Sequence, residues 1–500
     1  MGASGPTRQC VPDRFALAGI MLLALAARLW IVATHTYIAH PDETFQYLEP
    51  AHRLAFGSGV IAWEYLDGIR SWLLPGAIAG VMRLVALFDG DPRAYVLVLR
   101  LLCVAASMAI PYAGYRIAEQ VAGSEAAILA GLLCALSPQA VYFAPVIMTE
   151  PLATDAALLA IMIGGGARGR ARRLLLAGVL FGLACALRYQ YAPALGVAAL
   201  WQHARDRRSF WLVASAGAAV VVLLLGVLDA ATWRAPFQSV WLNYLRNGPQ
   251  GVSRAMGARD WYYYLLYFLA AWGVTLPILT ACLVLAARRA PAPMLMAGVT
   301  IGLHTIAPHK EIRFIFLALA TMPILIGIGL HEVAQRLPKR WSGLSVQAGL
   351  AVTLAVAIAA TTLSTATRPD AWHRDRSVLQ ATAAARAIPG VCGLGLRSIS
   401  VYRSGGYSYW HRDVPLFFEL WYPAQILWGS AFQLRSDGLL DGRRIPQYQT
   451  EEMPAHPEKF NAMIGVRSDT LPGFTVRSCF GLGTIDDRTI CVFTRPGGCS

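Results

Sequence analysis

The sequence has 500 residues, of which 56% are hydrophobic and only 14% are charged. A soluble domain carries about 25% charged residues, so the composition excludes an ordinary soluble protein and indicates a chain that crosses a membrane several times. The formal net charge of +14 does not indicate nucleic-acid binding, because the basic residues fall in short clusters between apolar runs and no reader motif accompanies them.

The apolar runs predict an all-α polytopic membrane bundle, since a spanning helix needs about 20 apolar residues. We expect about eleven spans, at residues 15–36, 94–117, 123–145, 150–166, 174–187, 189–202, 209–229, 261–287, 293–307, 312–330 and 343–364. A further apolar stretch, 71–88, has Pro75 near its start and Arg83 inside it. We predict that this stretch lies in the membrane interface or re-enters the membrane.

The basic clusters predict the orientation, because loops rich in Lys and Arg stay on the cytoplasmic side. They lie at 168–173, 203–209, 287–291 and 331–340, and all fall on one side if 71–88 does not span. The N-terminus is then inside and the C-terminus outside. This predicts a transmembrane catalytic domain over 1–364, with a first outer loop at 37–93, and an outer domain over 365–500.

The first outer loop begins with "HPDETFQYLE", residues 40–49. Pro41 suits the first position of a helix, and Asp42, Gln46 and Glu49 then share one helical face, whereas Glu43 points elsewhere. One interpretation is an interfacial helix whose acids are solvated and favoured by the helix dipole. The alternative is a general base, presented at the membrane surface to an acceptor hydroxyl.

A second polar segment, "APHKEIRFIF" at 307–316, interrupts two apolar runs on the outer side. Ionisable groups at that depth need partners or a function. His309, Lys310, Glu311 and Arg313 therefore form either internal ion pairs or an anion site. In the second case, Lys310 and Arg313 hold a lipid-linked phosphate, and Arg313 provides a bidentate grip.

The outer loop around 229–247 contains Trp233, Asn243 and Tyr244, which suit carbohydrate binding but also suit an aromatic belt at the interface. Three more places near the outer boundary carry one or two ionisable groups each. They are 64–72 with Asp67 and Arg70, 148–151 "MTEP", and Arg188. Satisfied interfacial charges are the simpler interpretation of all three.

The last quarter of the chain loses its long apolar runs and gains turn-forming and aromatic stretches, which favour a smaller mixed α/β domain. It also contains Cys392, Cys479, Cys491 and Cys499. In an oxidising compartment Cys479 and Cys491 are candidates for a disulfide, although the sequence does not fix the pairing. Four other cysteines lie in apolar runs and are expected to be small buried hydrophobes: Cys103, Cys134, Cys185 and Cys282.

Three of these segments, 40–75, 228–247 and "HKEIRF" at 309–314, together resemble glycosyltransferase family 22. This family contains mannosyltransferases that depend on lipid-phosphate mannose. Within it the segments are most similar to the branch that adds the third mannose of GPI anchors. The resemblance covers roughly residues 15–330 and implies a GT-C fold. It also implies inverting transfer of mannose from a polyprenyl or dolichyl phosphate to a lipid-linked acceptor.

Carried over by position, the resemblance implies a role for each matching residue. Catalysis is expected from Asp42 as general base together with Glu43. Binding of the donor phosphate is expected from His309, Lys310, Arg313 and Arg70. Contacts with acceptor or sugar are expected from His40, Gln46, Glu49, Trp233, Asn243 and Tyr244.

The expected partners are a polyprenyl-phosphate-linked sugar donor, a lipid-linked acceptor and membrane lipids, with no nucleic acid. We expect no cofactor and no metal site, because cations can hold the leaving phosphate. The sequence does not require a divalent metal, but its acidic residues do not exclude one. The Ala- and Arg-rich composition suggests a bacterial inner membrane with the site facing the periplasm, or an ER membrane with a lumenal site in a eukaryote. Alternatives are a GT-C enzyme that uses another sugar or a protein acceptor, and a flippase or transporter of lipid-linked saccharide.

Overall fold

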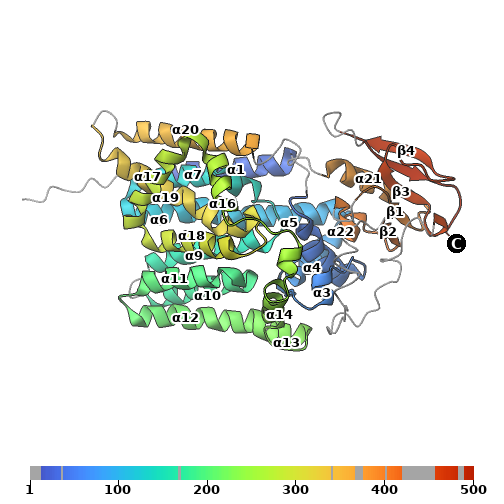
Figure 1. Cartoon of the computed structure of the whole chain (residues 1–500), viewed down its shortest axis with the longest axis horizontal. Helices are drawn as coiled ribbons and strands as arrows, with labels where there is room; N and C mark the ends of the chain where they lie inside the picture. Colours follow the sequence, from blue (N-terminus) through green and yellow to red (C-terminus); the bar gives the residue numbers. More distant parts are fainter. Residues whose placement is uncertain are drawn as a thin grey trace, which may run out of the picture.

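The structure is a computed structural model that describes residues 13–34, 38–166, 170–338, 342–365, 375–399, 403–418, 457–481 and 489–499. Most of these residues form a bundle of helices, and a smaller part with a β-sheet lies at one end of the bundle (Figure 1). The short helices of the first outer loop lie at the same end of the bundle. The arrangement agrees with the predicted helical bundle followed by a mixed α/β region.

Among the described residues, five helical segments are long and apolar enough to cross a membrane: Arg14–Thr34, Pro92–Ala122, Arg207–Thr232, Tyr263–Arg289 and Ile312–Ala334. They comprise α1 (Asp13–Thr34), α5 (Pro92–Ser107), α6 (Ala109–Ala122), α12 (Arg207–Val221), η3 (Val222–Val227), α13 (Leu228–Thr232), α16 (Tyr263–Trp272), η4 (Gly273–Thr275), α17 (Leu276–Arg289), η5 (Ile312–Ile315) and α19 (Phe316–Ala334). The chain is therefore an integral membrane protein.

Shorter helices complete the bundle: α7 (Ser124–Leu136), α8 (Pro138–Tyr142), α9 (Thr149–Gly165), α10 (Ala171–Leu187), η2 (Tyr189–Tyr191), α11 (Ala192–His203), α18 (Pro291–Ile306) and α20 (Leu344–Thr365). Each of the eleven ranges predicted to span thus contains a helix. Within the described residues, only five segments meet the length and composition of a span by themselves, so the expected count of about eleven is supported only in part.

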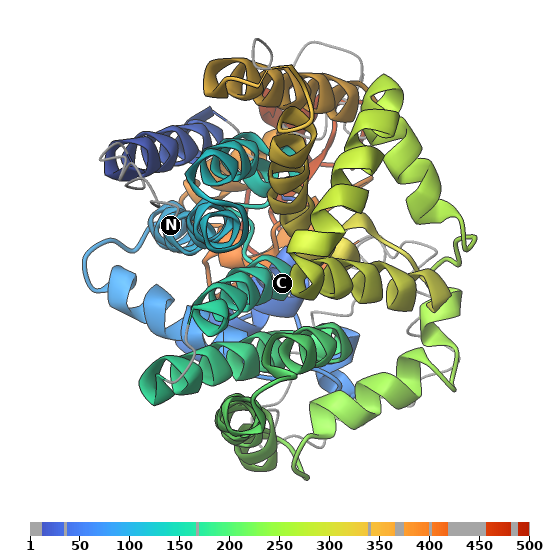
Figure 2. The ribbon, with the colours of Figure 1, turned by 90° about the vertical axis from the view of Figure 1, so that its left-hand side faces the viewer.

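Helix α19 is the most deeply buried of the long apolar helices, since 83% of its apolar window is covered by the rest of the protein. Small residues allow this: a Cβ added to Gly327 would lie 2.5 Å from the Ala130 Cα of α7. Such small-residue contacts let helix backbones approach closely in membranes. Figure 2 looks along the bundle and shows α1 (dark blue) and α12 (green) on its outside. The cationic segment that precedes α19 is therefore fixed to the centre of the bundle.

The segments outside the bundle are short helices. The first outer loop contains η1 (Glu43–Leu48), α2 (Glu49–Phe56), α3 (Trp63–Leu66) and α4 (Leu73–Ala86), and the later outer segments contain α14 (Gln238–Asn247) and α15 (Val252–Ala255). Helix α4 has 14 residues and thus measures about 21 Å, less than the roughly 30 Å of a bilayer core. This length is compatible with the interfacial or re-entrant position predicted for 71–88.

The C-terminal part is built on a five-stranded sheet of order β2-β1-β3-β5-β4. The strands are β1 (Leu394–Leu396), β2 (Leu416–Phe418), β3 (Ala462–Val466), β4 (Thr475–Phe480) and β5 (Ile490–Thr494). Helix α21 (Arg376–Arg386) precedes β1, α22 (Gly406–Trp410) lies between β1 and β2, and η10 (Pro457–Lys459) precedes β3. Strand β1 is parallel to β2 and β3, whereas β5 is antiparallel to β3 and β4.

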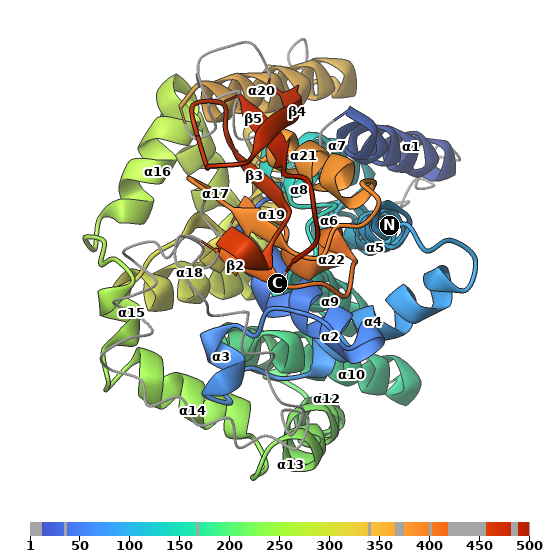
Figure 3. The same cartoon turned by 90° about the vertical axis from the view of Figure 1, so that its right-hand side faces the viewer.

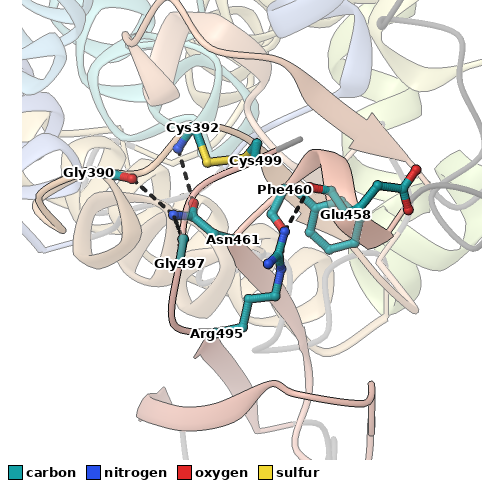
Figure 4. The surroundings of a disulfide bond; sticks show 8 residues. All are labelled: Gly390, Cys392, Glu458, Phe460, Asn461, Arg495, Gly497 and Cys499. Carbon is teal, nitrogen blue, oxygen red and sulfur yellow. Dashed lines mark hydrogen bonds between the residues drawn. A yellow bond between two sulfur atoms is a disulfide. The ribbon is translucent and has the colours of Figure 1, made fainter.

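Two disulfides close this sheet. Cys479 and Cys491 join β4 to β5, so the disulfide considered from the sequence is confirmed. Cys392 and Cys499 join the segment before β1 to the segment after β5. The side chain of Asn461 lies beside the second disulfide, where it accepts a hydrogen bond from the Cys392 N–H and donates to two backbone carbonyls (Figure 4).

The C-terminal part docks on the first outer loop through α22, and Figure 3 shows α22 beside α2 at this end of the molecule. The Glu49 carboxylate of α2 is fully buried and accepts hydrogen bonds from the N–H groups of Ser408 (2.6 Å) and Val60 (2.7 Å). His52 Nε2 lies 2.8 Å from His411 Nδ1. Glu49, expected to contact acceptor or sugar, thus lies in the contact between α2 and α22.

Candidate active site

The predicted catalytic acids lie where the chain enters η1, a π-helical turn of a kind that is frequent at functional sites. The Glu43 carboxylate accepts hydrogen bonds from the backbone N–H groups of Ala39 (3.1 Å) and Ile147 (3.2 Å). Burial raises the pKa of this carboxyl. Glu43 therefore anchors the turn to the bundle, and its neighbour Asp42 lines the cavity described below.

Asp42 meets the second predicted segment across the fold. Arg313 Nη2 lies 2.6 Å from Asp42 Oδ2, although 271 residues separate the two in sequence. Glu311 Oε2 lies 2.7 Å from Arg313 Nε and 3.1 Å from His40 Nε2. Glu311 Oε1 lies 2.8 Å from His309 Nε2. The structure thus brings five side chains of the two segments into one ionic network.

Glu150 and Arg188 extend the network into the bundle. Glu150 Oε1 lies 3.0 Å from Arg188 Nη1 and 3.3 Å from Arg313 Nη1. The Phe314 ring lies against both guanidinium groups, 5.2 Å from Arg188 Cζ and 5.0 Å from Arg313 Cζ, which is cation–π distance. From the sequence, Glu150 and Arg188 are expected to be satisfied interfacial charges. The pattern that could have indicated their role is the position of each ionisable residue at the boundary of an apolar run.

These side chains line a cavity of about 610 Å³ where the outer segments meet the bundle. This volume lies within the range of small-molecule sites. Its ionisable lining consists of the carboxylates Asp42, Glu64, Glu150 and Glu311, the arginines Arg70, Arg188 and Arg313, and the histidines His40, His304 and His309. Carboxylates and cations therefore converge on one sugar-sized space.

The network fixes the charge state of most of the groups outside the bundle. Burial and Arg313 disfavour a charged His40, but Asp42 and Glu311 outweigh them and raise the pKa of His40 to about 9. Burial also disfavours the ionised forms of Asp42 and Glu311, yet the surrounding cations hold the pKa of each well below its usual range. Glu64 differs, because burial raises its pKa to about 7.

Three more predicted residues line the cavity: Arg70, Gln46 and Asn243. Asn243 is fixed by the Tyr189 hydroxyl, which donates to its Oδ1 at 2.7 Å, and Gln46 donates to Glu64 Oε1 at 2.8 Å. Arg70 Nε is buried with no hydrogen-bond partner in the described residues. The described protein thus leaves this donor unsatisfied.

The structure does not bring Lys310, Trp233 or Tyr244 to the cavity lining. The Lys310 ammonium instead donates to the backbone carbonyls of Arg259 (2.9 Å) and Ala307 (2.6 Å). The Trp233 indole donates to the Arg70 carbonyl at 3.0 Å, so it supports the cavity wall from behind. Tyr244 is 65% exposed.

No group of three or more His, Cys, Asp and Glu side chains is arranged to hold a metal ion in the part of the chain that the structure describes. The carboxylates of the network are instead engaged by arginine and histidine. The chemistry that the arrangement offers is therefore proton transfer to a carboxylate, together with neutralisation of an anion by guanidinium groups.

Two solved structures have a similar fold. ArnT from Cupriavidus metallidurans bound to undecaprenyl phosphate aligns over 97% of this chain and 98% of its own, with a TM-score of 0.59 and 12% identity. The Archaeoglobus fulgidus oligosaccharyltransferase aligns over 80% of this chain and 64% of its own, with a TM-score of 0.53 and 13% identity. At these identities the likeness shows the fold alone.

The chain belongs to the Alg9-like mannosyltransferase family, whose model matches residues 19–383. Mouse GPI alpha-1,2-mannosyltransferase 3 is 25% identical over 299 residues, which are 59% of this chain and 55% of that protein. Yarrowia lipolytica GPI mannosyltransferase 3 is 25% identical over 338 residues, which are 64% and 63% of the two chains. Drosophila melanogaster GPI mannosyltransferase 3 is 44% identical over 81 residues, 16% and 14% of the chains. The match therefore covers less than two thirds of each relative.

Proposed function

We propose that this protein is an inverting membrane mannosyltransferase. It moves mannose from a polyprenyl-phosphate donor to a lipid-linked glycan or glycolipid at the outer face of the membrane. The observation that carries the proposal is that Asp42 lines one cavity together with Arg70 and Arg188, since the reaction needs a base and phosphate-binding cations around one sugar. Family membership and the names of the relatives support mannose as the transferred group.

In the proposed reaction, an acceptor hydroxyl oxygen attacks the anomeric carbon of mannose from the face opposite the phosphate. The Asp42 carboxylate takes the hydroxyl proton as the new C–O bond forms. The bond from the anomeric carbon to the phosphate oxygen breaks, and its electron pair leaves with the phosphate. One displacement of this kind inverts the anomeric configuration.

We propose Arg70, Arg188 and Arg313, with His309, as the cations that hold the donor phosphate. Arg313 is shared among three carboxylates, whereas Arg70 and Arg188 each keep a buried Nε without a hydrogen-bond partner in the described residues. Arginine binds phosphate oxygens through paired N–H groups, so the free donors suit this role. The ArnT structure with undecaprenyl phosphate supports a polyprenyl phosphate as the donor lipid.

The proposal also assigns the remaining cavity residues to the sugar and the acceptor. Gln46 and Asn243 present amides to hydroxyl groups, and His40 holds Asp42 and Glu311 in place. With the phosphate charge held by guanidinium groups, the scheme needs neither a cofactor nor a divalent metal. The N-terminus-in topology would place the cavity at the periplasmic face of a bacterial inner membrane, or in the ER lumen of a eukaryote.

The test is to incubate the purified protein with polyprenyl-phosphate mannose and a membrane lipid extract, and to identify by mass spectrometry the lipids that gain a hexose. We expect hexose transfer, and we expect Asp42→Asn to reduce kcat about a hundredfold to ten-thousandfold, the usual contribution of a general base. The matched variant Glu43→Gln should mainly lower thermal stability, because Glu43 binds backbone N–H groups. Wild-type turnover in Asp42→Asn would refute the assigned base.

A further inference from the structure

Glu64 differs from the other carboxylates of the cavity. Asp42, Glu150 and Glu311 each lie within ion-pair distance of at least one arginine. Glu64 lines the same cavity and is only 6% exposed, yet it forms no ion pair with any described residue. Burying a carboxylate without an ion pair is costly, so Glu64 is a candidate to bind a ligand whose hydroxyl groups donate further hydrogen bonds to it.

The local structure holds Glu64 in this position. It lies in α3, a short helix whose following turn is closed by a hydrogen bond from the Ile69 N–H to the Glu64 carbonyl at 2.8 Å. Gln46 Nε2 donates to Oε1 of the carboxylate at 2.8 Å, so the side chain is oriented from η1 as well. The carboxylate is therefore positioned by two elements that both line the cavity.

The neighbours of Glu64 indicate which ligand group it meets. The charged residues that act on it are Arg70, from the same loop, and Asp42, next to η1. Other ionisable residues around the cavity are His40, Glu150, Arg188, His304, His309, Glu311 and Arg313. In the function proposed above, Arg70 binds the phosphate and Asp42 faces the acceptor hydroxyl. The mannosyl group lies between the two, next to Glu64.

We propose that Glu64 binds hydroxyl groups of the donor mannose and thereby recognises the sugar rather than the lipid. This inference rests on the proposed function. A carboxylate that accepts hydrogen bonds from sugar hydroxyls replaces the solvation that burial removes. Because burial raises the Glu64 pKa to about 7, hydroxyl binding to the ionised form is linked to release of a proton. The sugar then contributes more affinity above that pH than below it.

The experiment measures the dissociation constants of polyprenyl-phosphate mannose and of bare polyprenyl phosphate, for the full chain in lipid nanodiscs. The ratio of the bare-lipid to the mannosyl-lipid constant is the sugar contribution. Glu64→Gln removes the charge but keeps an oxygen for Gln46 and nearly the same volume. A hydrogen bond to a charged group is worth about 1.5–3 kcal/mol, so we expect this variant to reduce the sugar contribution about tenfold to a hundredfold.

Two controls separate recognition from distortion. Binding of the bare lipid should be unchanged in Glu64→Gln, and the rise of the sugar contribution through pH about 7 should disappear. Asp67→Asn changes the same loop at a carboxylate that pairs with Arg246 at 3.0 Å and does not line the cavity, so it should keep the wild-type sugar contribution. An equal loss in Asp67→Asn would mean that loop distortion is the cause, and would overturn the proposal.

The outcomes distinguish the two proposals. If mannose is transferred but Glu64→Gln keeps the wild-type sugar contribution at every pH, then Glu64 does not recognise the sugar and only this inference is overturned. If the wild-type protein neither transfers mannose nor prefers the mannosyl lipid to the bare lipid, then the proposed function fails and this inference fails with it.

Discussion

We predict that Gly406→Ala destabilises the contact between the C-terminal part and the first outer loop. This residue has φ +58°, and a Cβ added to it would lie 2.6 Å from Glu49 Oε1. Gly406→Ala must therefore strain the backbone, at a cost of about 1–2 kcal/mol. It must also displace the Glu49 carboxylate from the N–H groups of Ser408 and Val60. Each hydrogen bond to a charged group contributes about 1.5–3 kcal/mol, so we expect a loss of about 4–8 kcal/mol for complete displacement.

Gly473 provides the matched control, because it has φ +82° in the same part of the chain but open space where a Cβ would be added. Gly473→Ala should show the backbone strain alone. The assay is the thermal unfolding midpoint of the purified full chain in detergent, combined with limited proteolysis between the bundle and the sheet. Equal losses in the two variants would refute the idea that the Glu49 contact holds the C-terminal part on the outer loop.

Two further predictions concern the phosphate site and the docking contact. Arg70→Met should raise the KM for the donor about tenfold to a hundredfold and leave the acceptor KM unchanged. Lys310→Met should lower the unfolding midpoint without a change in donor KM. Steady-state kinetics with each substrate varied measures the KM values, and a thermal scan measures the midpoint. Burial lowers the pKa of His52 from 6.5 to about 4, so the folded protein favours the neutral imidazole. Protonation of His52 in the unfolded chain therefore lowers the free energy of unfolding by up to about 3 kcal/mol as the pH falls from 6.5 toward 4. His52→Gln should flatten this dependence in unfolding scans across that pH range, and an unchanged dependence would assign the acid sensitivity to other groups.

The sequence predicted the helical bundle and the encounter of two distant segments for good physical reasons. The length of an apolar run is a strong signal for a membrane helix. Several ionisable groups at one membrane face must pair with one another or line a polar cavity, so two such motifs are expected to meet. The structure accordingly places Asp42 and Arg313 in contact. The partner of a single charged residue such as Arg188 cannot be predicted in this way, because it depends on which helix packs against that residue.

Side-chain direction within a predicted segment was harder to foresee. The helical spacing put Asp42, Gln46 and Glu49 on one face, but η1 is a π-helical turn, and Glu49 starts a separate helix that faces α22. Lys310 was grouped with Arg313 because both are cations, yet its ammonium is satisfied by carbonyl groups. Both differences arise from backbone geometry that residue types alone do not specify.

The deep burial of α19 has a mechanical consequence for the Asp42–Arg313 pair. Arg313 belongs to the turn that leads into the most enclosed long helix, whereas Asp42 belongs to the first outer loop, which is held in part by α22 of the C-terminal part. Relative movement between these supports would change the spacing of acid and guanidinium without altering either residue. Substitutions far from the sugar could therefore adjust turnover through distance alone.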